Sequence, residues 1–356
     1  MPMNNPAAQS KTFTESINEA LVQAMTLDSQ MICYGLGATD PKGIFGTTLG
    51  LEDKFGKSRV FDMPTSENAM TGVAIGAAID GIRSVTTHQR LDFFLLALDQ
   101  LVNSAAKWFY TYGRPVPITI RLIMGRGWGQ GPTHSQNLHA WFAHIPGLKV
   151  VMPSTAYDAK GLLLSSIFDP NPVVFLEHRW LHNSVSDVPD GDFRIPIGKA
   201  KIVRPGKTVT IVSMSYLVVE AMLAADYLNK HGVECEVLDL RTIKPIDWPA
   251  IYYSISRTGR LLALDTGHLT GSVAAEVVAR VTQHCFDQLK AAPRRLAMPD
   301  VPEPSSPGLT KGFYVRANHI VSEICAMMNL SREICEGAPI EPEPHDVPGN
   351  WFKGPF

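Results

Sequence analysis

The stretch at 209–240 limits most strongly what this chain can fold into. An apolar, β-branched run at 209–212 is followed by a helical pattern at 216–230, by Gly232 and by a second apolar run at 233–240. Because helices commonly end at glycine, this order predicts a strand, a helix and a second strand, which together form a β-α-β unit. The two strands of such a unit are parallel, so we expect a parallel sheet with helices on both faces.

The same alternation of strands and helices continues on both sides of this unit. Strand patterns lie at 31–34, 84–87, 116–123, 172–177, 260–264 and 295–298, and helical patterns lie at 68–81, 95–107 and 271–286. A length of 356 residues is comfortable for two domains. The sequence therefore predicts an α/β protein with two domains, at 12–190 and 196–330, each with a mostly parallel sheet flanked by helices.

Two segments interrupt this alternation. Residues 183–199 are rich in Asp, Pro, Ser and Gly and have no hydrophobic periodicity, which is typical of a linker between domains. Residues 331–356 are rich in proline, so we expect them to form an extended tail rather than a packed element.

The composition excludes several classes of protein. With 32 basic and 34 acidic residues, the chain has no excess of cations for a nucleic acid or an anionic membrane surface. Its most apolar stretch, 209–225, contains two serines and a glutamate and is too short to span a bilayer. The five cysteines are scattered without C-x-x-C spacing, which is typical of buried thiols in a reducing compartment. The first residues have no signal-peptide pattern, so we expect a cytoplasmic protein.

Four local patterns could carry chemistry, although none is specific alone. The glycine-rich segment 125–131 follows a strand but lacks the Lys-Ser/Thr of a phosphate-binding loop, so we expect a mobile loop that lines a cleft. His178 and His182 have helical spacing, yet no third metal ligand is near, which favours a surface or interface role. Glu67 stands where a helix begins, a place that the helix dipole favours for any acid. His134 also begins a helical stretch, where a hydrogen-bonded surface histidine is common.

Nine motifs, taken in chain order, give the sequence a resemblance that none carries alone. They lie at 59–67, 72–78, 98–107, 133–136, 146–153, 158–161, 171–174, 196–199 and 239–245. In their order and spacing, the chain resembles the beta subunit of the thiamine-diphosphate-dependent 2-oxoacid dehydrogenases, the decarboxylating component of complexes such as pyruvate and acetoin dehydrogenase. The resemblance covers roughly residues 12–330. It implies a transketolase-like pyrimidine-binding domain followed by a transketolase C-terminal-like domain.

The resemblance also implies a site for half of the cofactor. Glu67 matches the glutamate that hydrogen-bonds the aminopyrimidine ring of thiamine diphosphate and so activates the cofactor. Phe93 matches the aromatic residue that packs on this ring, and Gln89 lies close to it in the sequence. His134 matches an active-site histidine near the reacting carbons. Glu67 and His134 are thus the implied catalytic residues, and Glu67, Gln89 and Phe93 are the implied cofactor-binding residues.

Some members of the family also hold a structural potassium ion, largely through carbonyl oxygens. The matching positions here are Ile118, Ser166, Asp169 and Asn171. The sequence leaves open whether an ion is bound.

The other half of a thiamine-diphosphate site is missing from the sequence. That half needs a Gly-Asp-Gly motif to hold Mg²⁺ and the diphosphate, and the chain has none, because the similar run at 189–192 has the wrong order. The resemblance therefore implies an alpha subunit that supplies Mg²⁺ and the diphosphate site in an α2β2 heterotetramer. It leaves open a lipoylated acyltransferase as a further partner.

Several positions near the expected cofactor depart from the family pattern. Gly37 stands where an acidic residue is usual, and the segment 87–92 is far more polar than its usual apolar form. Gln89, Arg90 and Asp92 within this segment therefore predict a reshaped, more polar cleft.

Three other functions stay open at this point. The chain could be the C-terminal half of a split transketolase, although that family carries its glutamate in an Ala-Glu-Gln context and this chain has Ser66-Glu67-Asn68. It could also belong to a two-subunit enzyme that transfers a two-carbon acyl unit to an aldehyde or a ketosugar, which the polar cleft favours. A structural subunit without catalysis is the third, and the presence of both Glu67 and His134 argues against it.

Overall fold

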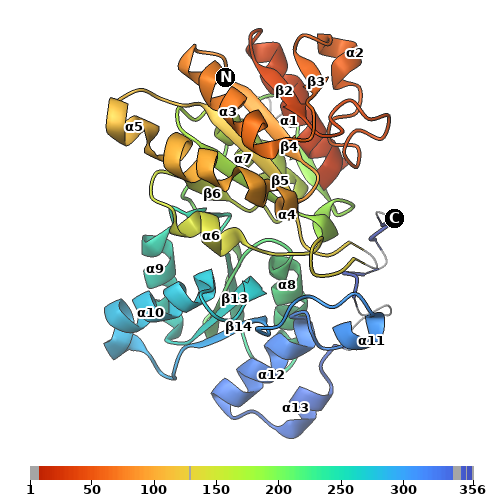
Figure 1. Ribbon diagram of the computed structural model, residues 1–356. Helices are drawn as coiled ribbons and strands as arrows, with labels where there is room; N and C mark the ends of the chain where they lie inside the picture. Colours follow the sequence, from red (N-terminus) through yellow and green to blue (C-terminus); the bar gives the residue numbers. More distant parts are fainter. Residues whose placement is uncertain (1–7, 128–129, 340–345, 350, 355–356) are drawn as a thin grey trace, which may run out of the picture.

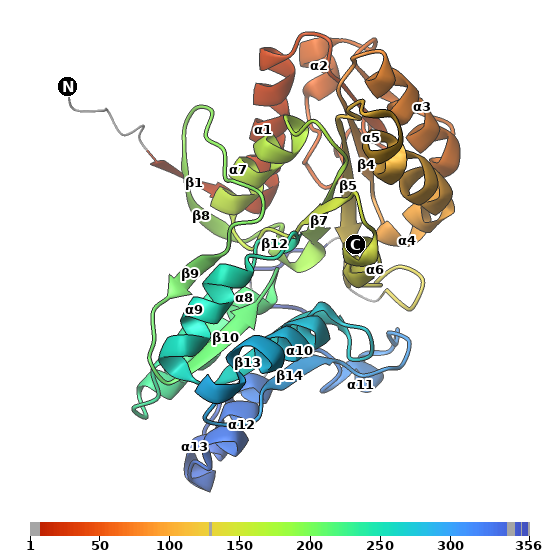
Figure 2. The ribbon, with the colours of Figure 1, turned by 90° about the vertical axis from the view of Figure 1, so that its left-hand side faces the viewer.

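The chain folds into two α/β units, each built on one open sheet. The computed structural model describes residues 8–127, 130–339, 346–349 and 351–354. The first sheet lies in the upper half of Figure 1 and the second in the lower half. Figure 2 shows helices on both sides of the first sheet, and apolar cores lie on both faces of each sheet. No helix among the described residues is long and apolar enough to cross a membrane. The expected α/β fold with two helix-covered sheets is confirmed.

The first sheet has seven strands in the order β12-β6-β7-β5-β4-β2-β3. All neighbours are parallel except β12, which pairs antiparallel with β6. The central strands are buried between helices, as is usual for parallel strands. The bounds are Ile32–Gly35 (β2), Val60–Asp62 (β3), Ser84–His88 (β4), Ile118–Met124 (β5), Lys149–Val151 (β6), Val173–His178 (β7) and Thr242–Lys244 (β12).

Two groups of helices cover the faces of this sheet. On one face, α1 (Phe13–Leu27) packs against α7 (Ala156–Ile167), and their apolar side chains share one core. The other face carries α3 (Glu67–Ile79), α4 (Leu91–Phe94), α5 (Ala106–Tyr112) and α6 (His139–His144). A short helix, α2 (Leu51–Phe55), precedes β3. The helix expected at 95–107 is irregular, since a 3₁₀ turn (Leu95–Ala97) and a π-helical stretch (Gln100–Ala105) lead into α5.

The second sheet has five strands in the order β14-β13-β10-β11-β9, and only β9 is antiparallel to its neighbour. The bounds are Lys201–Arg204 (β9), Val209–Ser213 (β10), Cys235–Asp239 (β11), Leu261–His268 (β13) and Arg294–Met298 (β14). One face carries α8 (Leu217–Asn229) and α12 (Ala317–Met328), and the other carries α9 (Trp248–Thr258) and α10 (Val273–Cys285). The short helix α11 (Pro307–Thr310) precedes α12. The predicted β-α-β unit at 209–240 is β10-α8-β11 and is confirmed.

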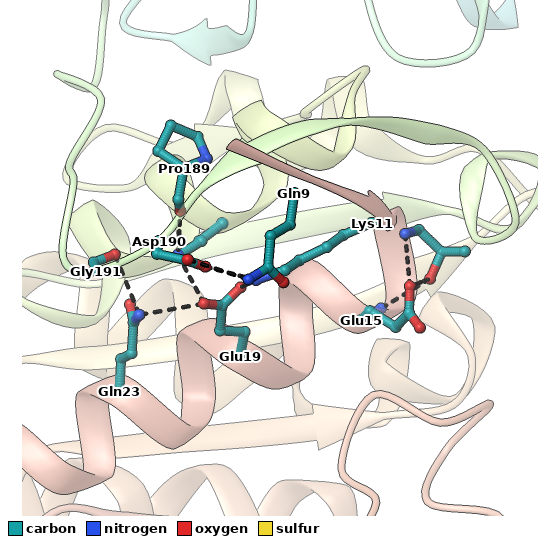
Figure 3. Close-up of polar contacts among 10 residues, drawn as sticks. Gln9, Lys11, Glu15, Glu19, Gln23, Pro189, Asp190 and Gly191 are labelled. Atoms are coloured by element: carbon teal, nitrogen blue, oxygen red, sulfur yellow. Dashed lines mark hydrogen bonds and ion pairs between the residues drawn. The ribbon is translucent and has the colours of Figure 1, made fainter. Parts of the chain in front are cut away.

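The segment expected to be a linker, 183–199, is partly structured. Its strand β8 (Val185–Pro189) pairs antiparallel with β1 (Ala8–Thr12) at the start of the chain. Asp190, which follows β8, is held to the start of the chain by an ion pair. Lys11 Nζ on β1 lies 2.8 Å from Glu19 on α1 and 3.3 Å from Asp190 (Figure 3). Such a two-stranded ribbon has no apolar alternation of its own, so the sequence pattern does not reveal it.

The end of the chain differs from the extended tail expected at 331–356. Its beginning is helical, as α13 (Arg332–Glu336). Farther on, Asp346 is buried and accepts a hydrogen bond of 2.8 Å from Arg126 Nη2, and the next two carbonyls accept hydrogen bonds from Arg316. The described residues after α13 thus pack against the rest of the protein. An extended segment cannot form hydrogen bonds to its own carbonyls, and side chains of the neighbouring elements donate these hydrogen bonds instead. Other parts of the tail lie outside the described residues.

Arg126 also holds the glycine-rich segment 125–131. Its guanidinium donates hydrogen bonds to the carbonyls of Pro304 and Ser305, at 2.6 and 3.0 Å. The side chain of Arg126 thus links the beginning of this segment to the C-terminal part of the chain, while the mobility expected from its glycines stays a prediction. Residues 128–129 lie outside the described residues.

An ion pair is buried between two strands of the first sheet. Arg121 on β5 donates two hydrogen bonds to Glu177 on β7, at 2.6 and 3.0 Å, and both side chains are fully buried. Burial by itself would raise the pKa of Glu177, but the charge and hydrogen bonds of Arg121 and the neighbouring His182 outweigh it, so the pKa is lowered. Removing one member of such a pair typically costs about 3–5 kcal/mol.

Three histidines near this pair are buried and neutral. Desolvation lowers the pKa of His88 to about 3 and that of His182 to about 4, and it lowers the pKa of His178 well below its usual value. The expectation of a surface or interface role for His178 and His182 is therefore wrong within this chain, because both side chains point into the core. Among the described residues, no group of three or more His, Cys, Asp or Glu side chains could hold a metal ion.

These histidines predict how stability depends on pH. In the unfolded chain each imidazole gains a proton near pH 6.5, whereas in the folded chain His182 gains one only near pH 4 and His88 near pH 3. The unfolded state therefore binds more protons below pH 6.5, so stability should fall as the pH is lowered from 6.5 towards 4, by up to about 1.4 kcal/mol per pH unit for each histidine. Urea unfolding measured at several pH values tests this, with exposed His231→Gln as a control that should not change the slope. A free energy of unfolding that stays constant over this range would contradict the prediction.

Candidate functional site

A cleft of about 570 Å³ opens where three neighbouring strands of the first sheet end. The segments that follow the carboxyl ends of β2, β3 and β4 line it, and these strands are adjacent in the order β4-β2-β3. Ligands of open α/β sheets commonly bind outside the carboxyl ends of the strands. The lining residues are Leu36, Gly37, Asp62, Met63, Thr65, Glu67, His88, Gln89, Arg90, Phe93 and Leu96. Glu67, Gln89 and Phe93, which the resemblance assigns to the cofactor, thus share one cleft.

Glu67 is the first residue of α3 and lines the cleft with its side chain largely buried. Only 4% of the residue is exposed, and among the described residues no side chain donates a hydrogen bond to its carboxylate. The start of a helix stabilises a negative charge, which helps to keep an acid at this place. The rest of the residue is buried, but its carboxylate oxygens open onto the cleft, where a ligand can supply a hydrogen-bond donor.

Phe93 and His134 meet at the edge of this cleft. Their rings are in edge-to-face contact, with centroids 5.3 Å apart, and both residues are exposed. His134 does not itself line the cleft and reaches it through Phe93. The loop that carries His134 is held to α4, because Gln136 donates from its side chain to Asp92 at 2.7 Å. The structure therefore places the fourth residue of the implied site beside the other three.

Gln89 and Gly37 face each other across the cleft wall. Gly37 has a positive φ of 80°, and a Cβ atom added there would collide with the side-chain nitrogen of Gln89. A larger residue at position 37 would therefore have to push this amide aside, and it would also be strained by the positive φ.

His88 and Arg90 also line the cleft, although neither is part of the implied site. His88 ends β4, and both of its ring nitrogens are buried without a hydrogen-bond partner among the described residues. Arg90 follows two residues later and is 5% exposed. The polar composition of segment 87–92 signals a changed cleft, but the sequence alone does not show which of these side chains face it.

The four residues of the implied potassium site gather near one end of the first sheet. Ile118 begins β5, Ser166 lies in the last turn of α7, and the other two follow before β7; in chain order they are Ile118, Ser166, Asp169 and Asn171.

Two side-chain cations already lie at these positions. Arg83 Nη1 donates to the carbonyls of Ile167 and Asp169, at 2.6 and 3.1 Å, and Lys149 forms an ion pair with the Asp169 carboxylate. An ion on the Asp169 carbonyl would share that oxygen with the positively charged Arg83 guanidinium, which would repel it. This arrangement fits a potassium ion poorly, although the buried side-chain oxygen of Asn171 has no partner among the described residues.

A second hollow lies between the two units, away from the implied site residues. Its volume is about 540 Å³, and it is lined by α6 and by the segment between β13 and α10. Inside it, His139 Nε2 lies 2.8 Å from Asp265 Oδ1, and both side chains are buried. The lining is mostly apolar and contains none of the residues that the resemblance assigns, so the cleft at Glu67 is the better candidate site.

Comparison with known proteins agrees with this geometry. Residues 9–183 match the transketolase pyrimidine-binding domain, and residues 198–320 match the transketolase C-terminal domain. The chain is 41% identical over 319 residues to the pyruvate dehydrogenase E1 component subunit beta of Rhizobium meliloti, covering 89% of this chain and 69% of that protein. It is 42% identical to the beta subunit of acetoin:2,6-dichlorophenolindophenol oxidoreductase of Cupriavidus necator, covering 86% of this chain and 94% of that protein.

Two further similarities extend the comparison. The 2-oxoisovalerate dehydrogenase subunit beta of Bacillus subtilis is 39% identical, covering 87% of this chain and 96% of that protein. A solved split-gene transketolase, an inactive beta4 tetramer, superposes with a TM-score of 0.71 at 21% identity, covering 92% of this chain and all of that one, which shows a shared fold. The chain therefore belongs to the family of E1 beta subunits of the thiamine-diphosphate-dependent 2-oxoacid dehydrogenases.

Proposed function

We propose that the cleft around Glu67 binds the aminopyrimidine half of thiamine diphosphate, and that Glu67 and His134 are the catalytic residues of this chain. The observation that carries the proposal is Glu67 at the start of α3, a largely buried residue whose carboxylate lines a cleft together with an aromatic ring. A flat, partly apolar heterocycle with ring nitrogens suits such a lining, because Phe93 offers it a ring face or edge and Glu67 offers it a hydrogen-bond acceptor.

The residues of the cleft fit this cofactor half. When bound, thiamine diphosphate supplies the carbon nucleophile and the electron sink that decarboxylation of a 2-oxoacid requires. Glu67 would hold a proton between its carboxylate and a ring nitrogen, which restores the hydrogen bond that the carboxylate lacks. Phe93 and Leu96 would keep water away from the bound ring. His134, at the edge of the cleft, would donate a hydrogen bond or a proton to the substrate.

The remaining half of the site belongs to a partner in this proposal. The E1 beta family implies an alpha subunit, and the absence of a Gly-Asp-Gly motif from the sequence supports the assignment of Mg²⁺ and the diphosphate site to it. We further propose an α2β2 assembly that passes the acyl group to a lipoylated acyltransferase. A structural potassium ion stays a prediction, and Arg83 and Lys149 argue against it.

The alternative functions are not favoured. The curated relatives named above share about 40% identity with this chain and are E1 beta subunits, whereas the split-gene transketolase shares 21%. The presence of Glu67 and His134 in or beside one cleft argues against a purely structural subunit.

The half-site proposal predicts that the chain depends on its partner. The purified chain alone should show neither decarboxylation nor Mg²⁺-dependent binding of thiamine diphosphate, and both should appear when an alpha-type subunit is added. Calorimetric titration of the chain with thiamine diphosphate and Mg²⁺, with and without the partner, measures this. Tight binding by the chain alone would show that the diphosphate site lies within it.

Substitution of Glu67 tests the proton-holding role. Glu67→Gln keeps the size of the side chain but cannot share a proton, so exchange of the thiazolium proton of the cofactor, followed by NMR in the reconstituted complex, should slow on the order of 100-fold or more. Affinity for the cofactor should fall much less. Glu52→Gln, which changes an acid in the first turn of α2 far from the cleft, is the matched control. Near-normal proton exchange in Glu67→Gln would mean that another carboxylate activates the cofactor.

Substitution of His134 separates substrate chemistry from cofactor activation. Because His134 lies at the edge of the cleft rather than in its lining, His134→Ala should slow turnover of the 2-oxoacid roughly 100-fold and leave thiazolium-proton exchange nearly unchanged. The exposed His231→Ala controls for loss of an unrelated imidazole. If both steps slowed equally in His134→Ala, the histidine would have a structural role instead.

A further inference from the structure

The proposed function gives no role to Arg90, the cationic side chain among those that line the cleft. Arg90 precedes α4 and lines the cleft together with Glu67 and Phe93, although it is only 5% exposed. A buried guanidinium is costly unless an anion or several acceptors surround it. The partners of Arg90 therefore decide whether it serves the fold or a ligand.

Arg90 has few partners within the protein. Among the described residues, its hydrogen bonding is limited to one long contact of 3.5 Å from Nη1 to the Gly125 carbonyl, and no carboxylate lies within ion-pairing distance. Burial lowers the pKa of Arg90, and the nearby charge of Asp92 compensates only in part. One oxygen of Asp92 is already engaged by Gln136, and the other is buried without a hydrogen-bond partner among the described residues. The buried Arg179 repels Arg90, so Asp92 offsets the charge of this guanidinium only in part.

The neighbours of Arg90 in the cleft are further unsatisfied or flexible donors. Both ring nitrogens of His88 are buried without a partner among the described residues, and its lowered pKa keeps the ring neutral with one N–H donor. The amide of Gln89 is exposed beside Gly37. A guanidinium fork with nearby amide and imidazole donors is the set that binds carboxylates and phosphates. The acids of the cleft, Asp62 at the end of β3 and Glu67 at the start of α3, would repel such an anion from their side.

We infer that Arg90 is a specificity-determining residue that binds a second anionic group, a carboxylate or a phosphate, on a substrate of this enzyme. The inference rests on the proposed function, because it places the substrate in the cleft at Glu67. The bound group is not the carboxylate that leaves as carbon dioxide. That carboxylate loses its charge during decarboxylation, so a cation paired with it would stabilise the ground state more than the transition state. The second anion therefore stays on the 2-oxoacid or belongs to the molecule that accepts the acyl unit.

Direct binding of small anions tests the site without relying on turnover. Inorganic phosphate and malonate are titrated calorimetrically into the complex reconstituted with the alpha subunit, thiamine diphosphate and Mg²⁺. The wild-type complex should bind at least one of them, and Arg90→Gln should weaken binding about 10-fold or more, as expected for loss of a charged hydrogen-bond partner. Arg90→Lys, which keeps the charge but loses the fork, should be intermediate. The exposed Arg114→Gln, with the same loss of charge far from the cleft, should bind like the wild type.

Kinetics with paired substrates then identify the source of the anion. In one arm, 2-oxoglutarate is compared with 2-oxovalerate, which lacks the second carboxylate. In the other arm, pyruvate is the donor and glyceraldehyde 3-phosphate is compared with glyceraldehyde as the acceptor. The wild type should prefer the anionic member of one pair, and Arg90→Gln should raise the KM for that member about 10-fold or more while the KM for pyruvate changes little.

The outcomes separate failure of this inference from failure of the proposed function. Equal anion binding by wild type and Arg90→Gln, or equal loss for charged and uncharged substrates, would overturn the role of Arg90 and leave the decarboxylase proposal intact. Absence of any 2-oxoacid decarboxylation by the wild-type complex would instead overturn the proposed function. If Arg90→Gln does not fold, as judged by circular dichroism, the Arg90→Lys variant decides: unchanged anion affinity and substrate preference in a folded Arg90→Lys complex contradict the inference.

Discussion

The parallel pairing of β2 with β3 and β4 brings every other part of the site into place. At the end of β2, Gly35 lies so close to the Thr87 carbonyl of β4 that a Cβ atom would collide with it, so only glycine allows the strands to stay together up to their ends. The segments that leave these three strands therefore begin side by side. One of them, after β3, leads within a few residues into α3, which places Glu67 at the same edge and turns its carboxylate into the cleft.

Burial sets the charge of the groups behind this edge. Arg121 and Glu177 stay charged because each supplies what the other needs, through two hydrogen bonds in the middle of the sheet. His88 and His182, close to the same strands, lose their charge through desolvation, which at His182 outweighs the attraction of Glu177. Neither solution applies to Arg90, since a guanidinium does not release its proton at neutral pH and Asp92 offsets its charge only in part. The cleft is therefore one place in the first unit where the chain alone leaves a buried charge without an ion-pair partner.

How much of this could be predicted depends on how local each signal is. Strands such as β10 and β11, and helix α8, are predicted by hydrophobic runs and a terminating glycine. The motifs that carry the family resemblance contain Glu67 and His134, whereas Gln89 and Phe93 lie between motifs and are only implied by the resemblance. By contrast, β1 pairs with β8 across most of the first unit, and Asp346 meets Arg126 across 220 residues. Such long-range contacts leave no periodic pattern. The burial of His178 and His182 could not be predicted from the sequence either, because spacing along the chain does not show which way a side chain points.

The departures at positions 37 and 89 explain why the family fixes the cofactor half of the site but not the substrate. Gly37 brings no acid to the segment after β2, and the end of the Gln89 side chain lies beside it. Gln89 and Arg90, on the segment after β4, therefore present an amide and a guanidinium to the cleft. Glu67 begins α3, beyond the end of β3, so these positions leave the group proposed to activate the cofactor in place. One part of the cleft lining thus carries acids and another carries hydrogen-bond donors, so an anionic group of a ligand fits best beside Arg90.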